Sequence, residues 1–76
     1  MIHTISAFDK STELMVFEID VAQKILPELK VIMVWTEPED EIFGYDLSSE
    51  QLQKLEELLG QKFYDQRCDF QLSSYA

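Results

Sequence analysis

The side chains of this chain that could carry chemistry are mostly carboxylates, and they gather in one segment. Residues 36–57 contain eight acids and one base, Lys54, so this segment holds a net charge of −7 out of −9 for the whole sequence. The acids are Glu37, Glu39, Asp40, Glu41, Asp46, Glu50, Glu56 and Glu57. Locally concentrated negative charge repels nucleic acid and anionic membranes and attracts basic surfaces. The composition therefore predicts a basic protein partner, without direct contact to nucleic acid or membrane.

Carboxylates this close together suggest calcium binding or acid–base catalysis, and the sequence supports neither. An EF-hand loop that began at Glu37 would need glycine at position 42 and glutamate at position 48, where the chain has Ile42 and Ser48. A catalytic carboxyl group needs an apolar pocket to raise its pKa, and no such pocket is visible beside the loop. We expect no metal, no cofactor and no enzymatic activity, and loose divalent-cation binding remains a third-ranked alternative.

The single histidine and single cysteine, His3 and Cys68, are far apart in the sequence, and no motif joins them into a nucleophilic pair. We expect a structural or surface role for His3 and a small buried hydrophobe at Cys68. One cysteine fits a reducing compartment. The longest uncharged run, Met1–Phe8, is far shorter than the ~20 residues of a membrane span. A cytoplasmic location is therefore expected.

An N-terminal hairpin is predicted, because β-branched and aromatic residues at Ile2–Phe8 and Leu14–Ile19 flank the turn-forming residues Asp9–Thr12. Alternation in the second run predicts a core-facing set of Met15, Phe17 and Ile19. Near the C-terminus, residues 67–72 alternate in the same way and predict a third strand, with Cys68, Phe70 and Leu72 on one face.

Two helices are predicted between the hairpin and the third strand. Ser48 and Gln51 form a capping box and Gly60 supplies a stop, which indicates a helix over 49–59. Pro27 suits the first position of a helix from 27 to about 34, although residues 31–35 also fit a buried strand. Residues 42–46 either add a short strand or lead into the second helix. Residues 1–76 thus predict a single α+β domain, an antiparallel sheet with two helices on one face in the order β-β-α-α-β.

Aromatic residues flank the acidic loop, which favours a docking surface over a loop that is merely solvated. Trp35 precedes the loop, and Phe43 and Tyr45 follow it. Protein interfaces favour aromatic anchors ringed by polar residues. The predicted contact residues are Glu37, Glu39, Asp40 and Glu41, with Trp35 and Tyr45 as anchors and a second patch of Asp9, Glu13 and Glu18 on the hairpin. A solvated surface that keeps a small domain soluble is the alternative.

The six residues Phe8-Asp9-Lys10-Ser11-Thr12-Glu13, at a tight turn after the first strand, resemble the opening hairpin of the cloacin and ribonuclease-colicin immunity family. That family consists of small, acidic, cytoplasmic proteins, each with a mainly antiparallel sheet, that block a toxin nuclease carried by the same cell. The resemblance implies an immunity protein against a bacterial ribonuclease, of the colicin class or the related contact-dependent growth inhibition class. A small acidic adaptor or regulatory domain is the alternative function.

Overall fold

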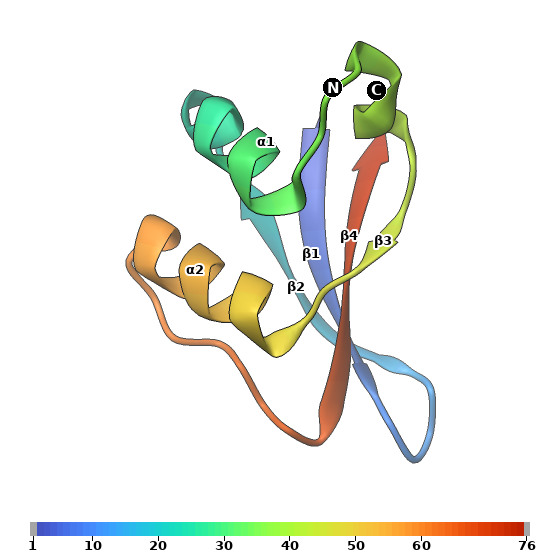
Figure 1. Cartoon of the computed structure of the whole chain (residues 1–76). Coiled ribbons are helices and arrows are strands. Elements are labelled where there is room, and N and C mark those ends of the chain that lie inside the picture. The colour runs from blue at the N-terminus through green and yellow to red at the C-terminus, as the bar shows by residue number, and fades with distance from the viewer. Residues whose placement is uncertain (1, 76) are drawn as a thin grey trace.

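The chain folds into one antiparallel sheet with two helices on one face, as predicted for the α+β class (Figure 1). The computed structural model describes residues 2–75. The strands lie in the spatial order β2-β1-β4-β3, so the first and last long strands are neighbours at the centre of the sheet. The elements in chain order are β1 (Ile2–Asp9), β2 (Met15–Val21), the 3-10 turn η1 (Gln23–Ile25), α1 (Leu26–Met33), the 3-10 helix η2 (Pro38–Ile42), β3 (Tyr45–Asp46), α2 (Ser49–Leu59) and β4 (Cys68–Tyr75).

The predicted hairpin is confirmed, and the Asp9 side chain organises its turn. Oδ1 of Asp9 accepts hydrogen bonds from the amide and hydroxyl of Ser11 (2.8 and 2.6 Å) and from the amide of Thr12 (3.0 Å). The Asp9 amide donates to the carbonyl of Leu14 at 2.9 Å and closes the loop. Glu13 takes the left-handed conformation, with φ 63°. Asp and Ser favour such turns because their side chains bond the nearby backbone.

A register shift between Ala7 and Phe8 changes the predicted core face of β2. Phe17 pairs with Ala7 and packs against the core, but Met15 pairs with Phe8. Directly paired residues lie on the same face of a sheet, so Met15 lies on the face opposite Phe17 and is 52 % exposed. The prediction that Met15 shares a core face with Phe17 and Ile19 is therefore wrong, because an irregular pairing interrupts the alternation.

The core lies between the sheet and the two helices. From the central strands, Ile5 pairs with Leu72 and Ala7 with Phe70, and all four side chains face the helices. The buried core consists of Ile5, Ala7, Val21, Leu29, Met33, Leu47, Leu52, Leu55, Cys68, Phe70 and Leu72. The predicted inward face of the C-terminal strand is thereby confirmed, and the strand continues past Leu72 to Tyr75.

The helical interpretation of residues 27–34 is confirmed, and the strand alternative for residues 31–35 is wrong. Pro27 lies in the first turn of α1, where its missing amide hydrogen costs nothing. The helix ends at Met33 because Val34 adopts the left-handed conformation, with φ 58° and ψ 38°. The amide of Trp35 donates to the carbonyl of Lys30, and that of Val34 donates to Val31. This pattern is a Schellman motif, in which glycine normally occupies the position of Val34.

Both predicted ends of α2 are confirmed. The Ser48 side chain accepts the amide of Gln51 at 3.2 Å, and the Gln51 side chain accepts the amide of Ser48 at 2.9 Å. Gly60 ends the helix with φ 70°. Residues 42–46 both add a short strand and lead into α2, because Tyr45 and Asp46 pair with β4 immediately before the helix cap.

Candidate functional site

The acidic loop forms η2, and Asp40 is used to build it. The Asp40 carboxylate accepts the amides of Thr36 (3.0 Å) and Glu37 (3.1 Å), while the Glu37 side chain accepts the amide of Asp40. These bonds form a capping box around the start of the 3-10 helix. Glu39 is exposed and makes no such bond to the described residues. Of the first three predicted contact acids, Glu39 is therefore the one most available to a partner.

Glu41 turns inward and fastens the loop to the sheet. Its carboxylate lies 3.3 Å from Nε2 of His3, which is 3 % exposed, and 3.9 Å from Nζ of Lys30. The hydroxyl of Ser74 donates to the Glu41 carbonyl. The loop is thus tied to the beginning of β1 and the end of β4. His3 has the expected structural role, as the anchor of Glu41.

The two predicted anchors, Trp35 and Tyr45, pack within the protein. The Trp35 ring lies 5.5 Å from the His3 ring and 5.6 Å from the Tyr45 ring. The Tyr45 hydroxyl donates to the carbonyl of Asp40 at 2.8 Å. Both side chains are partly buried against the core. The large apolar side chains that the loop exposes are instead Ile42 and Phe43, at 55 % and 53 %.

Two of the hairpin acids, Asp9 and Glu13, lie at the other end of β1 from the acidic loop, whereas Glu18 pairs with Ser6 in the middle of that strand. His3, which holds the loop, is near the start of β1, whereas Asp9 ends that strand. A strand rises about 3.3 Å per residue, so roughly 20 Å separates the two ends. Three hydrogen bonds from Ser11 and Thr12 hold the Asp9 carboxylate in the turn and lower its pKa. A partner can contact both patches only by covering the sheet between them.

The sheet between the patches presents an acidic face that carries no helix, hereafter the open face. Alternation places Thr4, Ser6 and Phe8 opposite the core, and register adds the residues paired with them. The open face consists of Ile2, Thr4, Ser6, Phe8, Met15, Glu18, Asp20, Asp46, Asp69, Gln71, Ser73 and Tyr75. Four of these are acids, all exposed, and none is Lys, Arg or His.

The open face joins Glu18, which was predicted, with Asp20, Asp46 and Asp69, which were not. A local signal existed for Asp69, because it alternates with the core residues Cys68 and Phe70. The acids of the open face come from three strands, so only the strand order brings them together.

Glu56, counted with the anionic segment in the sequence, is a structural residue. It is buried on α2, and its Oε2 accepts the amides of Phe63 (2.7 Å) and Tyr64 (2.9 Å). These bonds lower the pKa of Glu56 and hold the connection between α2 and β4. Glu56 therefore stabilises the connection between α2 and β4 and offers no contact surface to a partner.

His3 and Cys68 do not form a nucleophilic pair in this structure. His3 pairs with Ser74 at one end of the β1–β4 ladder and Cys68 pairs with Asp9 at the other, so the two cannot act together. Burial raises the pKa of the Cys68 thiol, which disfavours the nucleophilic thiolate. Residues 2–75 also hold no cluster of three or more His, Cys, Asp or Glu arranged to bind a metal ion.

One protein-family model, described as a domain of unknown function (DUF7683), matches residues 2–73. Comparison with curated proteins and with solved structures finds no significant match. Among the described residues, no helix has both the length and the apolar character that a membrane crossing requires.

Proposed function

Because the chain belongs to the DUF7683 family, whose description assigns no activity, we propose a function from its surface. We propose that the protein is a non-enzymatic immunity protein that binds a basic toxin domain, a nuclease, and neutralises it. The observation that carries the proposal is the open face, whose four acids have no cation beside them on the sheet.

Electrostatics favour a nuclease as the target. A nuclease needs a basic surface to hold phosphates. An acidic inhibitor complements that surface, speeds the encounter and competes with the nucleic acid for the same cations. The net charge of −9 also attracts a basic partner at long range, whatever the direction of its approach. Binding of this kind is expected to weaken as salt is added.

The size of the open face indicates what else must take part. Three long strands present a face roughly 25 Å long and 14 Å wide, from a rise of about 3.3 Å per residue and a strand spacing of about 4.8 Å. This is less than half of the ~800 Å² that each partner buries in a standard interface. We therefore assign the rest of the contact area to exposed side chains at either end of the face. These are Glu39 and Phe43 in the loop and Glu13 in the hairpin.

The test is a growth assay followed by a binding assay. The product of the adjacent reading frame is expressed with and without this protein, and we expect growth to stop only in its absence. The dissociation constant of the purified pair is then measured for Glu18→Lys combined with Asp69→Lys. We expect at least a tenfold weakening, about 1.4 kcal/mol. Glu50→Lys combined with Glu57→Lys, at two exposed sites on α2, makes the same change of net charge and should change the dissociation constant far less.

The loop is tested by Glu39→Lys, which leaves the capping bonds of Asp40 and Glu37 in place. If Glu39→Lys weakens binding and the open-face variant does not, the loop alone is the contact surface. If the neighbouring gene product is harmless, the immunity function is refuted and the adaptor function takes its place.

A further inference from the structure

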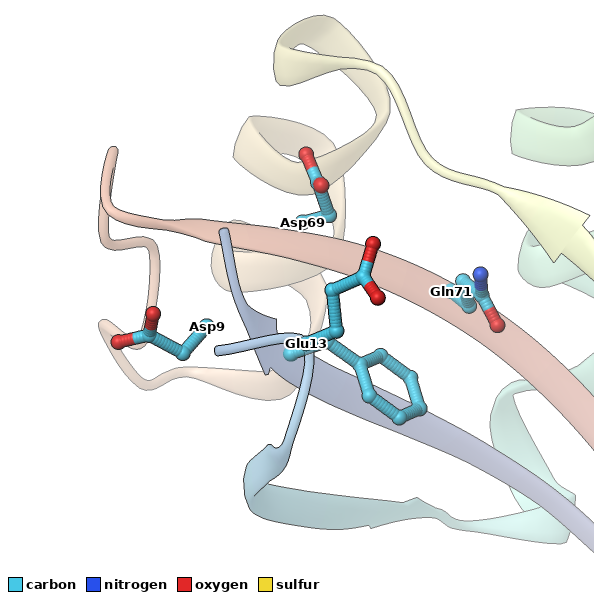
Figure 2. Close-up of a pocket in the computed structure, with 5 residues that line it drawn as sticks. Asp9, Glu13, Asp69 and Gln71 are labelled. Atoms are coloured by element: carbon cyan, nitrogen blue, oxygen red, sulfur yellow. The ribbon is translucent and has the colours of Figure 1, made fainter. Parts of the chain in front are cut away.

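A hollow of about 290 Å³ opens at the hairpin end of the open face (Figure 2). It is lined by Phe8, Asp9, Glu13, Asp69 and Gln71. The Glu13 side chain extends over β4 toward the space between Asp69 and Gln71, whereas the Asp9 carboxylate points away from them and accepts hydrogen bonds from Ser11 and Thr12. The volume is several times the ~30 Å³ of a water molecule, so it can admit a side chain from a partner.

The polar groups that face this hollow lack partners within the described chain. The side chains of Glu13, Asp69 and Gln71 make no hydrogen bond or ion pair to residues 2–75. All three residues are exposed, so their polar atoms are accessible to a donor supplied by another molecule.

We infer that the hollow is a binding site for a guanidinium group, supplied by an arginine side chain of the basic partner. Two carboxylates and an amide oxygen match the several N–H donors of a guanidinium. The Phe8 ring supplies an aromatic wall on which the planar cation can stack. A lysine ammonium lacks the planar shape and the forked donors, so the site should discriminate against it. The inference rests on the proposed function, because it names the chemistry of that partner at the open face.

The test is a chemical-shift titration of the whole protein with three small probes. These are the N-acetyl amides of arginine, lysine and citrulline, of which citrulline has the shape of arginine without its charge. We expect saturable shifts at the amides of Glu13, Asp69 and Gln71 with arginine. The dissociation constant for arginine should be at least about threefold lower than that for lysine, from stacking on Phe8, and citrulline should give no saturable shift.

Two variants and a control locate the binding. Glu13→Asn removes the charge and keeps a residue that tolerates the left-handed backbone found at this position. Asp69→Asn removes the second charge from an exposed strand position. Each should raise the dissociation constant for arginine at least about fivefold, the loss expected for one charge-assisted contact. Glu57→Gln, on α2, makes the same change of net charge and should leave it unaltered.

The inference is overturned if arginine gives no saturable shift, if lysine binds equally well, or if Glu13→Asn and Asp69→Asn behave like the control. The growth assay separates this failure from failure of the proposed function. Growth rescue without arginine binding would refute the guanidinium site and leave the immunity function standing. Arginine binding without rescue would do the reverse.

Discussion

Val34 offers a test of how the backbone of α1 ends. A β-branched residue is a poor choice for the left-handed conformation, because its Cβ crowds the neighbouring carbonyl oxygen. Val34 nevertheless holds φ 58° at the end of this helix, directly before the segment that leads to the acidic loop. We predict that Val34→Gly stabilises the protein.

The magnitude follows from three contributions. Relief of the left-handed strain is worth about 2 kcal/mol, at the upper end of the range for L-residues. Glycine loses more backbone freedom on folding, which costs about 0.7 kcal/mol. The Val34 side chain is 77 % exposed, so its deletion forfeits only about 0.4 kcal/mol of burial. The free energy of unfolding should rise by about 1 kcal/mol, equivalent to roughly 4–8 °C in Tm for a chain of this size.

Val31→Gly is a matched control, since Val31 is also 77 % exposed but lies inside α1. There glycine should cost about 0.8 kcal/mol, roughly half from its lower helix propensity than valine and roughly half from lost burial. Urea unfolding of both variants, followed by circular dichroism, measures the difference, which we expect to be about 2 kcal/mol. Equal destabilisation by the two variants would show that strain at Val34 does not contribute.

Two further predictions concern titration. Hydrogen bonds from Arg67 lower the pKa of Asp65 to about 2, and hydrogen bonds also lower the pKa values of Asp9 and Glu56. A carboxyl group whose pKa is lower in the folded than in the unfolded state stabilises the fold while it is ionised. The contribution of these three groups is therefore present above pH ~4 and is lost as the pH falls toward 2. The urea midpoint should therefore drop between pH 4 and pH 2, and Arg67→Gln should make that drop smaller; an unchanged slope would exclude Asp65 as a source. Burial raises the pKa of the Cys68 thiol, so iodoacetamide should label the native protein at pH 8 at least about tenfold more slowly than the urea-unfolded protein, and equal rates would contradict its burial.

The elements predicted best are those whose signals are local. Ser48, Gln51 and Gly60 mark both ends of α2 within one short segment, and the structure confirms each. The end of α1 has no such local signal, because valine occupies the position at which a glycine would indicate the end of the helix. Met15 was misplaced because a shift in pairing depends on the partner strand as well as on the alternation within β2.

The candidate site was less predictable because it depends on contacts between distant residues. Glu41 and His3 are 38 positions apart, and nothing near Glu41 indicates that it turns inward. The open face needs β1 between β2 and β4, an order that no local pattern encodes. The sequence shows that the protein is acidic. It does not show which acids are exposed to a partner and which form bonds within the fold.

The pairing of β1 with β4 governs when the open face can form. Ile2 pairs with Tyr75, and the ladder continues to Asp9 and Cys68, so β1 gains its second neighbour only when the final strand has been synthesised. Until then the hairpin lacks Phe70 and Leu72 beneath it and Asp69 beside it. Pairings between such distant segments form late and slowly. A nascent chain therefore displays the acids of residues 36–57 before β4 has emerged from the ribosome, and it acquires the open face only afterwards.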